Sequence, residues 1–350
     1  MRIKPTTKII KTGPCASFLF VCFLLISGLL GCVDKAQPVV FTGATMGTSY
    51  HIKLINGDTP IPSDLGERIG ARLQELDNKF TTYQDNSELM QFNQSQLNQS
   101  HVVSVDMRAV LRIAKKVFNL SGGAFDPTIA PLVNLWGFGP SYTGDVVPQS
   151  VDISELLSSV GFNYLVFDEQ SGTVSRDADI QLDLSAVAKG YAVDAIAALL
   201  DSHGYQNYMV EVGGELRVNG RKENDQLWRI AIEKPSIHQS GVQYALSLEN
   251  IAVATSGDYR NYFESEGKRY SHTIDPRTGY PIEHNLASVT VLADTTAMAD
   301  ALATAMMVMG PESAMKLAEQ QKLAVYLLVK EGDDFKPLSS AMFTQYLSGE

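Results

Sequence analysis

Closely spaced strand-type segments in the middle of the chain place the strongest limit on its fold. Five apolar or alternating segments follow one another with short links, and they are residues 208–212, 216–219, 228–232, 244–248 and 252–255. A parallel neighbour needs a crossover of a dozen or more residues, usually through a helix. Links as short as these therefore predict strands that pair antiparallel with one another.

Helices are predicted where apolar residues recur with helical spacing after a capping residue. Leu65 and Ile69 follow the capping residue Asp64, and Gly310 would close a helix over 296–309. The other predicted helices cover residues 110–117, 186–200 and 313–321, and the other predicted strands cover 50–54, 164–168, 173–176, 180–184, 288–292 and 324–330. We expect an α+β fold with a largely antiparallel sheet core and helices packed on one side of it.

The first residues have the features of a secretion signal. A basic start without acids precedes an apolar run, residues 18–30, that is shorter than a membrane span. Gly31 followed by Cys32 resembles the end of a bacterial lipobox, which implies cleavage before Cys32 and acylation of its sulfur. The alternative is an uncleaved anchor with an incidental cysteine. We expect a lipoprotein signal peptide over 1–31, a lipidated tether over 32–40 and one domain over 41–350.

Cysteine content and charge exclude several classes of function. The chain has 3 Cys, at positions 15, 22 and 32, so the predicted domain has no thiol. This excludes a disulfide framework, a thiolate nucleophile and a cysteine-ligated metal. The net charge is −11 and becomes more negative without the basic leader, which argues against a partner that is a nucleic acid. We expect a periplasmic protein whose lipid anchors it to the inner membrane, or alternatively to the outer membrane.

The densest group of chemically active side chains lies in the segment 271–282. It contains the imidazole of His272, the carboxyl of Asp275 and the guanidinium of Arg277, with turn-forming prolines between and after them. An imidazole has a reference pKa of about 6.5 and can move a proton near neutral pH. Arg277 either binds phosphate or holds the turn.

A helix near the C-terminus contains a possible cation site. Asp300 and Thr304 are spaced i, i+4, so both lie on one helix face. Alanines surround Asp300, which indicates a buried carboxyl that needs a partner, and no basic residue lies within a turn. One carboxylate with hydroxyl or carbonyl oxygens suits Mg²⁺, although an ordinary helix contact would have the same pattern. Together with the segment 271–282, this predicts a site for a polyphosphate and a hard cation.

Three earlier segments contain further candidate ligand contacts. Met46, before Gly47, can pack against a flat ring, and Tyr83 offers a stacking face with a hydroxyl. Phe125 and Asp126 follow a pair of glycines that is typical of a helix end. A plain loop would also explain Met46, and a short capped helix would explain the residues after Tyr83. A helix C-cap explains the glycines but not Phe125 and Asp126.

The segment 181–194 passes from a predicted strand into a predicted helix. The free N–H groups of the first helical turn, aided by Lys189, can bind an anion. Asp183 can accept a hydrogen bond from the polar edge of a ring. The alternatives are that Asp183 only caps the helix and that Lys189 is solvated.

Six of these segments occur in the order seen in one family. They are residues 45–48, 82–89, 123–128, 183–194, 271–279 and 299–305. The sequence resembles the ApbE family, the bacterial FAD:protein FMN transferases, and the resemblance covers nearly all of the chain after the leader. It implies an ApbE-like domain over 41–350 that uses Mg²⁺ to transfer FMN from FAD to a threonine of an acceptor protein, releasing AMP. The implied acceptors are subunits of the sodium-translocating NADH:quinone reductase or of Rnf-type complexes.

The resemblance also implies roles for individual residues. His272 would be the catalytic base or a phosphate ligand, and Asp275 would orient it. The carbonyl of Ala186 would hold Mg²⁺ together with Asp300 and Thr304. FAD would be lined by Met46, Tyr83, Ala124, Phe125, Asp126, Asp183, Lys189, His272, Thr273 and Ile274. Two alternatives remain, an FAD pyrophosphatase that releases FMN and AMP, and a flavin-binding lipoprotein without catalysis.

Overall fold

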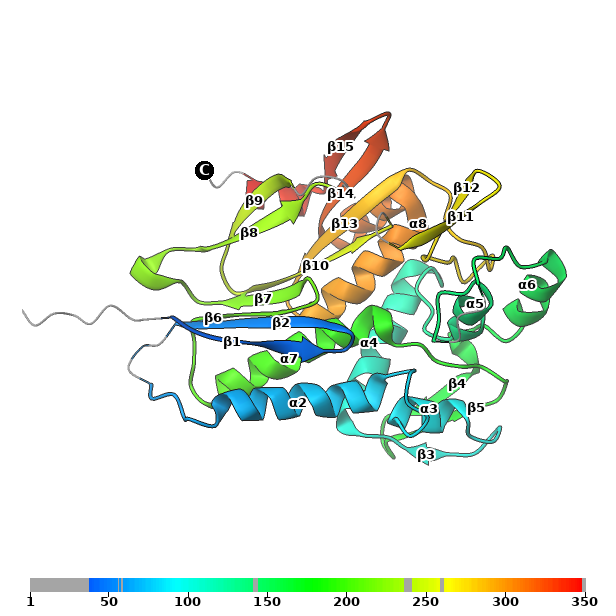
Figure 1. Ribbon diagram of the computed structural model, residues 1–350, viewed down its shortest axis with the longest axis horizontal. Helices are drawn as coiled ribbons and strands as arrows, with labels where there is room; N and C mark the ends of the chain where they lie inside the picture. Colours follow the sequence, from blue (N-terminus) through cyan, green and yellow to red (C-terminus); the bar gives the residue numbers. More distant parts are fainter. Residues whose placement is uncertain are drawn as a thin grey trace, which may run out of the picture. The chain divides into compact units, whose positions relative to one another are not determined.

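The computed structural model describes residues 38–55, 57, 59–140, 144–235, 241–258 and 261–347 (Figure 1). They belong to one structural unit, Gln37–Glu350. The predicted signal peptide and the lipidation site Cys32 lie outside the described residues. Within the described ranges, no helix has the length and apolar content needed to cross a membrane.

An eight-stranded sheet lies at the centre of the fold (Figure 1). Its order is β1 (Pro38–Thr45), β2 (Thr48–Ile55), β6 (Tyr208–Val212), β7 (Glu215–Asn219), β10 (Ile251–Gly257), β13 (Leu286–Ala293), β14 (Ala324–Glu331) and β15 (Asp334–Ser339). All seven neighbouring pairs are antiparallel. The prediction of a largely antiparallel sheet is confirmed. Short links join β1 to β2, β6 to β7 and β14 to β15, and a parallel crossover has no room there.

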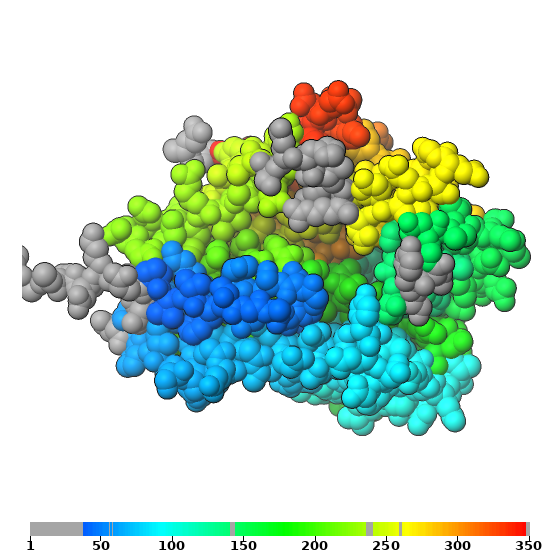
Figure 2. Space-filling view, viewed as in Figure 1, coloured from blue at the N-terminus to red at the C-terminus, as the bar shows by residue number. Residues whose placement is uncertain are grey.

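Four long helices lie on one side of this sheet, three of them in contact with its strands and the fourth packed on the other helices. They are α2 (Leu65–Phe80), α4 (Val105–Ser121), α7 (Ser185–Ser202) and α8 (Thr296–Gln321). Leu73, Val193 and Ala303 share one apolar cluster with Val291 and Leu327 of the sheet. In the space-filling view, β1 and β2 (dark blue) border α2 (light blue) on the visible face (Figure 2). Helices on one side of the sheet were expected from the sequence, and these four agree.

The other face of the sheet is covered by smaller elements. The ring of Tyr326 in β14 lies 5.2 Å from that of Phe343 in α9 (Ala341–Leu347). Leu327, the neighbour of Tyr326, belongs to the cluster on the opposite face, because successive side chains of a strand alternate. The hairpin of β8 (Trp228–Glu233) and β9 (Val242–Leu248) contacts α9. This cover explains why nearly every residue of β13 is buried.

Smaller elements complete the domain. They are α3 (Glu88–Asn93), β3 (His101–Val102), α5 (Ala130–Leu135), α6 (Ser150–Leu157), η2 (Phe162–Tyr164), β4 (Leu165–Asp168), β5 (Thr173–Arg176), η3 (Glu223–Asp225), β11 (Tyr262–Ser265) and β12 (Lys268–Ser271). A second apolar cluster joins Trp136 to Phe263 of β11 and Ile274 beyond β12. This cluster supports the segment that contains His272.

Two boundaries differ from the sequence predictions. Residues 180–184 form no strand, because the side chain of Asn93 makes hydrogen bonds to the N–H and carbonyl of Leu182, at 2.8 and 2.9 Å. Strand β1 begins at Pro38, so the end of the predicted tether belongs to the sheet, where a proline is tolerated at the start of an edge strand. The predicted break between the two C-terminal helices is confirmed, because Gly310 (φ 76°) leaves the helical conformation within α8.

Candidate functional site

A cavity of about 500 Å³ collects most of the predicted site residues from distant parts of the chain. Its lining includes Tyr83, Ala124, Phe125, Asp126, Asp183, Ala186, Lys189, His272, Thr273, Ile274, Asp300 and Thr304. The end of α4, the start of α7, the middle of α8 and the segment after β12 meet there. Met46 and Asp275 do not line this cavity.

His272 is held in one tautomer by the backbone. The carbonyl of Asn261 accepts from the His272 N–H at 3.1 Å and from its Nδ1 at 3.0 Å. A carbonyl can only accept, so Nδ1 carries the proton and Nε2 is left as a proton acceptor. Burial lowers the pKa of His272 below its ordinary value of 6.5, although the bond to Asn261 opposes this effect. The imidazole is therefore neutral near pH 7 and can accept a proton.

Asp275 does not orient His272, and this prediction is wrong. Its carboxylate accepts from the Arg277 side chain, at 2.8 Å from Nε and 2.7 Å from Nη2, and from the Arg277 N–H at 2.9 Å. The two residues are only two positions apart, so a turn can close this pair locally. The Asn261 carbonyl takes the orienting role instead. Of the alternatives for Arg277, the structure favours the one in which it holds the turn.

The predicted magnesium ligands lie together where α7 and α8 cross. A Cβ atom on Gly190 would lie 2.5 Å from the Thr296 carbonyl oxygen, so only glycine allows the two helices to approach this closely. The Gly190 N–H in α7 donates to Asp300 Oδ2 in α8 at 3.0 Å, which ties the carboxylate to the neighbouring helix. Ala186 and Thr304 line the same cavity as Asp300.

The oxygen atoms of this group fit a hard cation. Asp300 is 3% exposed, and its burial raises its pKa, which Lys189 opposes. Thr304 Oγ1 lies 3.2 Å from Ser256 Oγ. Among the described residues, no three side chains of the His, Cys, Asp and Glu types are grouped to hold a metal. A carboxylate, a hydroxyl and a carbonyl with open positions is the incomplete oxygen set that Mg²⁺ completes with water and phosphate.

Two other predicted carboxylates are committed to local structure. Asp126 accepts from Thr128 N–H and Oγ1, at 2.9 and 2.6 Å, and from Phe162 N–H at 3.0 Å. Burial raises the pKa of Asp126, and these hydrogen bonds oppose the rise. Asp183 accepts from the Ser185 N–H at 2.8 Å. Both residues line the cavity, but their carboxylates already have partners in the chain, and for Asp183 this agrees with the alternative that it caps the helix.

Of the aromatic and sulfur side chains predicted to contact FAD, Phe125 and Tyr83 line the cavity and Met46 does not. Phe125 is buried in the cavity wall, whereas Tyr83 is 76% exposed at the cavity. Met46 lies in the turn between β1 and β2 at φ 48°, and its N–H is 3.3 Å from Asp77 Oδ2. Met46 does not line the cavity, so the structure does not support its predicted place in the site. The turn directs its N–H toward α2 instead.

Three residues of the site were missed by sequence reasoning. Asn261 and Phe138 support His272, and the Phe138 ring lies edge-on at 6.3 Å from the imidazole. Glu215 lines the cavity and lies 3.3 Å from the Nζ atom of Lys189. An available signal was the pair Gly213 and Gly214 directly before this acid, since both adopt positive φ in the turn between β6 and β7.

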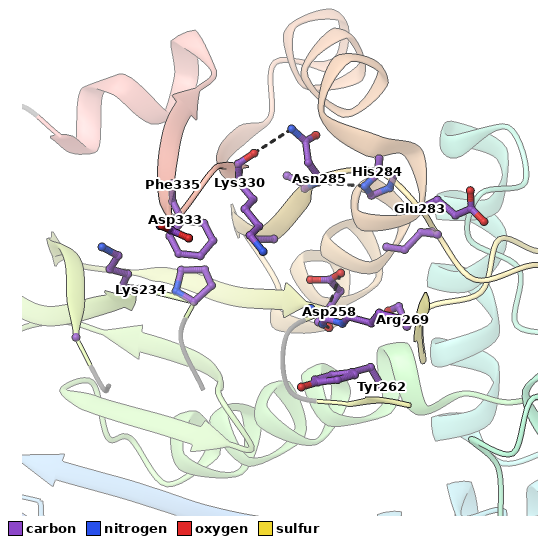
Figure 3. A pocket seen from close by; sticks show the side chains of 16 residues that line it. Lys234, Asp258, Tyr262, Arg269, Glu283, His284, Asn285, Lys330, Asp333 and Phe335 are labelled. Atoms are coloured by element: carbon purple, nitrogen blue, oxygen red, sulfur yellow. Dashed lines mark hydrogen bonds and ion pairs between the residues drawn. The ribbon is translucent and has the colours of Figure 1, made fainter. Parts of the chain in front are cut away.

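A second cavity, of about 590 Å³, adjoins the His272 segment through Ser271 and Ile282. Ser271 and Asp258 line the second cavity. Their chain neighbours His272 and Gly257 line the first. Neighbouring residues therefore form a thin wall between the two. Figure 3 shows charged side chains around this second hollow, including Lys330, Arg269 and Asp258.

Known proteins resemble this chain over most of its length. The family model described as the ApbE family matches residues 46–327. The FAD:protein FMN transferase of Vibrio cholerae is 44% identical over 322 residues, which cover 91% of this chain and 96% of that protein. The FAD:protein FMN transferase of Escherichia coli strain K12 is 40% identical over 332 residues, covering 92% and 95%.

Solved structures are similar over the same extent. The flavin transferase ApbE from Vibrio cholerae has a TM-score of 0.83 and 42% identity, covering 89% of this chain and 100% of the other. The apo form of the Pseudomonas stutzeri flavinyl transferase ApbE has a TM-score of 0.84 and 39% identity, covering 91% and 99%.

Proposed function

Because the chain belongs to the ApbE family, we propose that it transfers FMN from FAD to a threonine hydroxyl of an acceptor protein and releases AMP. The relatives named FAD:protein FMN transferase match most of the chain, which supports flavin transfer as the reaction class. The observation that carries the proposal is one cavity with two functions. It joins a neutral histidine with a free Nε2 to an oxygen-rich cation site formed by Ala186, Asp300 and Thr304.

The reaction needs one bond to form and one to break. The threonine oxygen bonds to the phosphorus of the FMN half of FAD, and the bond from that phosphorus to the bridging oxygen breaks. AMP leaves with the bridging oxygen. The hydroxyl proton passes to His272 Nε2, which is unprotonated because Nδ1–H donates to the Asn261 carbonyl. Lys189, which lines the cavity at the start of α7, provides positive charge toward the diphosphate.

We propose Mg²⁺ as the cation, held by the Ala186 carbonyl, Asp300 and Thr304. When bound, it would neutralise the negative charge of the diphosphate and of the departing phosphate. The Gly190 N–H fixes the orientation of the Asp300 carboxylate toward the cavity. Phe125 and Phe138 line the same cavity and reduce access of water to the reacting atoms.

The test is incubation of the purified protein with FAD, Mg²⁺ and candidate acceptor proteins, followed by denaturation. Flavin fluorescence and a mass increase on the denatured acceptor, with stoichiometric AMP, are the expected results. Free FMN and AMP without a labelled acceptor would favour the FAD pyrophosphatase. Bound but unchanged FAD would favour a flavin-binding lipoprotein without catalysis.

The acceptor and the location are also proposals. We propose acceptor subunits of the sodium-translocating NADH:quinone reductase or of Rnf-type complexes, and a periplasmic enzyme whose Cys32 lipid anchors it to the inner membrane. The basic, then apolar leader that ends at Cys32 supports the location. Mass spectrometry of the mature N-terminus tests it, since an unmodified Cys32 in membrane fractions would contradict a lipid anchor.

A further inference from the structure

Glu215 is a buried carboxylate in the cavity wall that takes no part in the step proposed above. It is the first residue of β7 and is only 5% exposed. Its Oε1 lies 3.3 Å from Lys189 Nζ, and its Oε2 is buried with no hydrogen-bond partner among the described residues. A buried carboxylate costs free energy unless it is paired, so its presence here needs a reason.

Lys189 lies near two buried carboxylates but pairs with one of them. Burial lowers its pKa, but the charges of Asp300 and Glu215 outweigh this effect and raise the pKa well above its ordinary value. Burial raises the pKa of Glu215 to about 8, and the Lys189 ammonium opposes this rise by pairing with its carboxylate, while Asp300 accepts from the Gly190 N–H at 3.0 Å. The charge of Asp300 therefore acts on the Lys189 ammonium, although the ammonium pairs with Glu215.

The turn before Glu215 is shaped around the stem of Lys189. Gly213 has φ 61°, and a Cβ atom there would lie 3.3 Å from Lys189 Cδ and 2.8 Å from Thr48 Cγ2. A larger residue would crowd the lysine stem at the point where it passes to Glu215. Backbone conformation and side-chain charge therefore both place the ammonium on the Glu215 side of the cavity.

We propose that Glu215 is a positioning residue that holds the Lys189 ammonium off the Asp300 carboxylate, so that Asp300 stays available to a divalent cation. This role rests on the proposed function, because it presupposes the cation site. Without Glu215, the partly exposed Lys189 ammonium keeps only a long contact of 3.5 Å to the Ser185 carbonyl, and the charge that acts on it most strongly is that of Asp300. A cation would then have to displace Lys189 before it could bind.

The experiment measures Mn²⁺ binding to the purified full-length protein without FAD, from the electron paramagnetic resonance signal of free Mn²⁺. Mn²⁺ is the probe because it shares the oxygen ligands of Mg²⁺. Glu215→Gln should weaken binding about tenfold, and Lys189→Met should tighten it about tenfold, because a positive charge near the site is removed. In the Lys189→Met protein, adding Glu215→Gln should weaken binding by less than about threefold, because the competing ammonium is gone and only the loss of a nearby negative charge remains.

The matched control is Glu211→Gln, which alters a carboxylate that accepts from the Gly214 N–H at 2.7 Å in the same turn but does not contact Lys189. Mn²⁺ affinity should be unchanged in this variant. Glu215→Asp keeps the charge but withdraws it from Lys189, and it should weaken binding to an intermediate degree. This variant serves if Glu215→Gln does not fold, as judged by thermal unfolding.

The outcomes separate the two proposals. Equal weakening by Glu215→Gln in both backgrounds would mean that Glu215 acts on the cation directly, and it would overturn the positioning role. Unchanged affinity in Glu215→Gln would also overturn it while leaving the cation site intact. If the wild-type protein binds no Mn²⁺, the magnesium site of the proposed function fails, and the role of Glu215 fails with it.

Discussion

The two cavities next to the His272 segment differ in whether their charged side chains are exposed and paired or buried and only partly paired. In the second cavity, Lys234 and Glu283 each have an ion-pair partner, at 3.4 and 2.6 Å, and both pairs lie among exposed side chains. Arg269 lies over the Tyr262 ring, 4.0 Å from its centroid. Charges of this kind are solvated and contribute little to stability.

The first cavity contains charges that are buried and only partly paired. Glu215 has an oxygen without a partner among the described residues, and Asp300 is almost fully buried beside a single backbone donor. Burial without full pairing is unfavourable, so such groups persist where a ligand completes them. The larger, second cavity is therefore the poorer candidate for chemistry. The smaller, first cavity is the better one, because its buried carboxylates lack full pairing within the chain.

The largest effect is expected for Asp300→Ala. Removal of the one carboxylate at the cation site should abolish release of AMP from FAD, a loss of at least about a hundredfold, since charge stabilisation at the reacting centre is usually the largest single contribution. The assay is AMP formation by chromatography. The matched control in the second cavity is Asp333→Ala, which should retain activity within about twofold because that carboxylate is exposed. Comparable losses in both variants would break the comparison.

A slightly smaller effect is expected for His272→Ala. Loss of a general base typically costs about 10²–10⁴-fold in rate, and FAD binding should be largely kept. Flavin transfer and FAD binding by fluorescence are measured in parallel. His284→Ala removes the histidine that lines the second cavity and should change the transfer rate less than about threefold. Loss of FAD binding in His272→Ala would identify this residue as a phosphate ligand instead.

The pH dependence of transfer should report the His272 environment. The base must be neutral, so kcat/KM should rise with pH through the pKa of His272 and then level off. Since burial lowers that pKa, the midpoint of the acidic limb should lie below 6.5. Rates measured across the acidic range at saturating Mg²⁺ test this. A midpoint above 6.5 would contradict a buried histidine as the base.

The smallest effect is expected for Asp275→Asn. The substitution weakens the bidentate pair with Arg277, whose side chain is 44% exposed, so it should cost about 0.5–1 kcal/mol of unfolding free energy. The transfer rate should change less than about threefold, because Asp275 does not contact His272. Urea unfolding and a transfer assay give the two values. A loss as large as that of His272→Ala would restore the catalytic role predicted from the sequence.

Local patterns predicted much of the fold. The spacing of Leu65 and Ile69 after Asp64, and the positions of Gly122 and Gly310, located helices whose ends are set by backbone geometry within a few residues. Strand order across the sheet was not predictable, because β6 pairs with β2 from more than a hundred residues away. Residues 180–184 have the composition of a strand, but the distant Asn93 side chain takes the hydrogen bonds of Leu182.

The same division holds for the site. The sequence alone determined which chemical groups the chain contains, and ordered motifs were enough to indicate the family and to pick out His272, Asp300 and Thr304. Only the tertiary structure decided which of these groups face one another. The Asp275 carboxylate was captured by its neighbour Arg277, whereas Glu215 became part of the site because antiparallel pairing and two glycines carry it to Lys189. The strength of a charge interaction depends on the distance between the groups and on their burial, and the tertiary fold sets both.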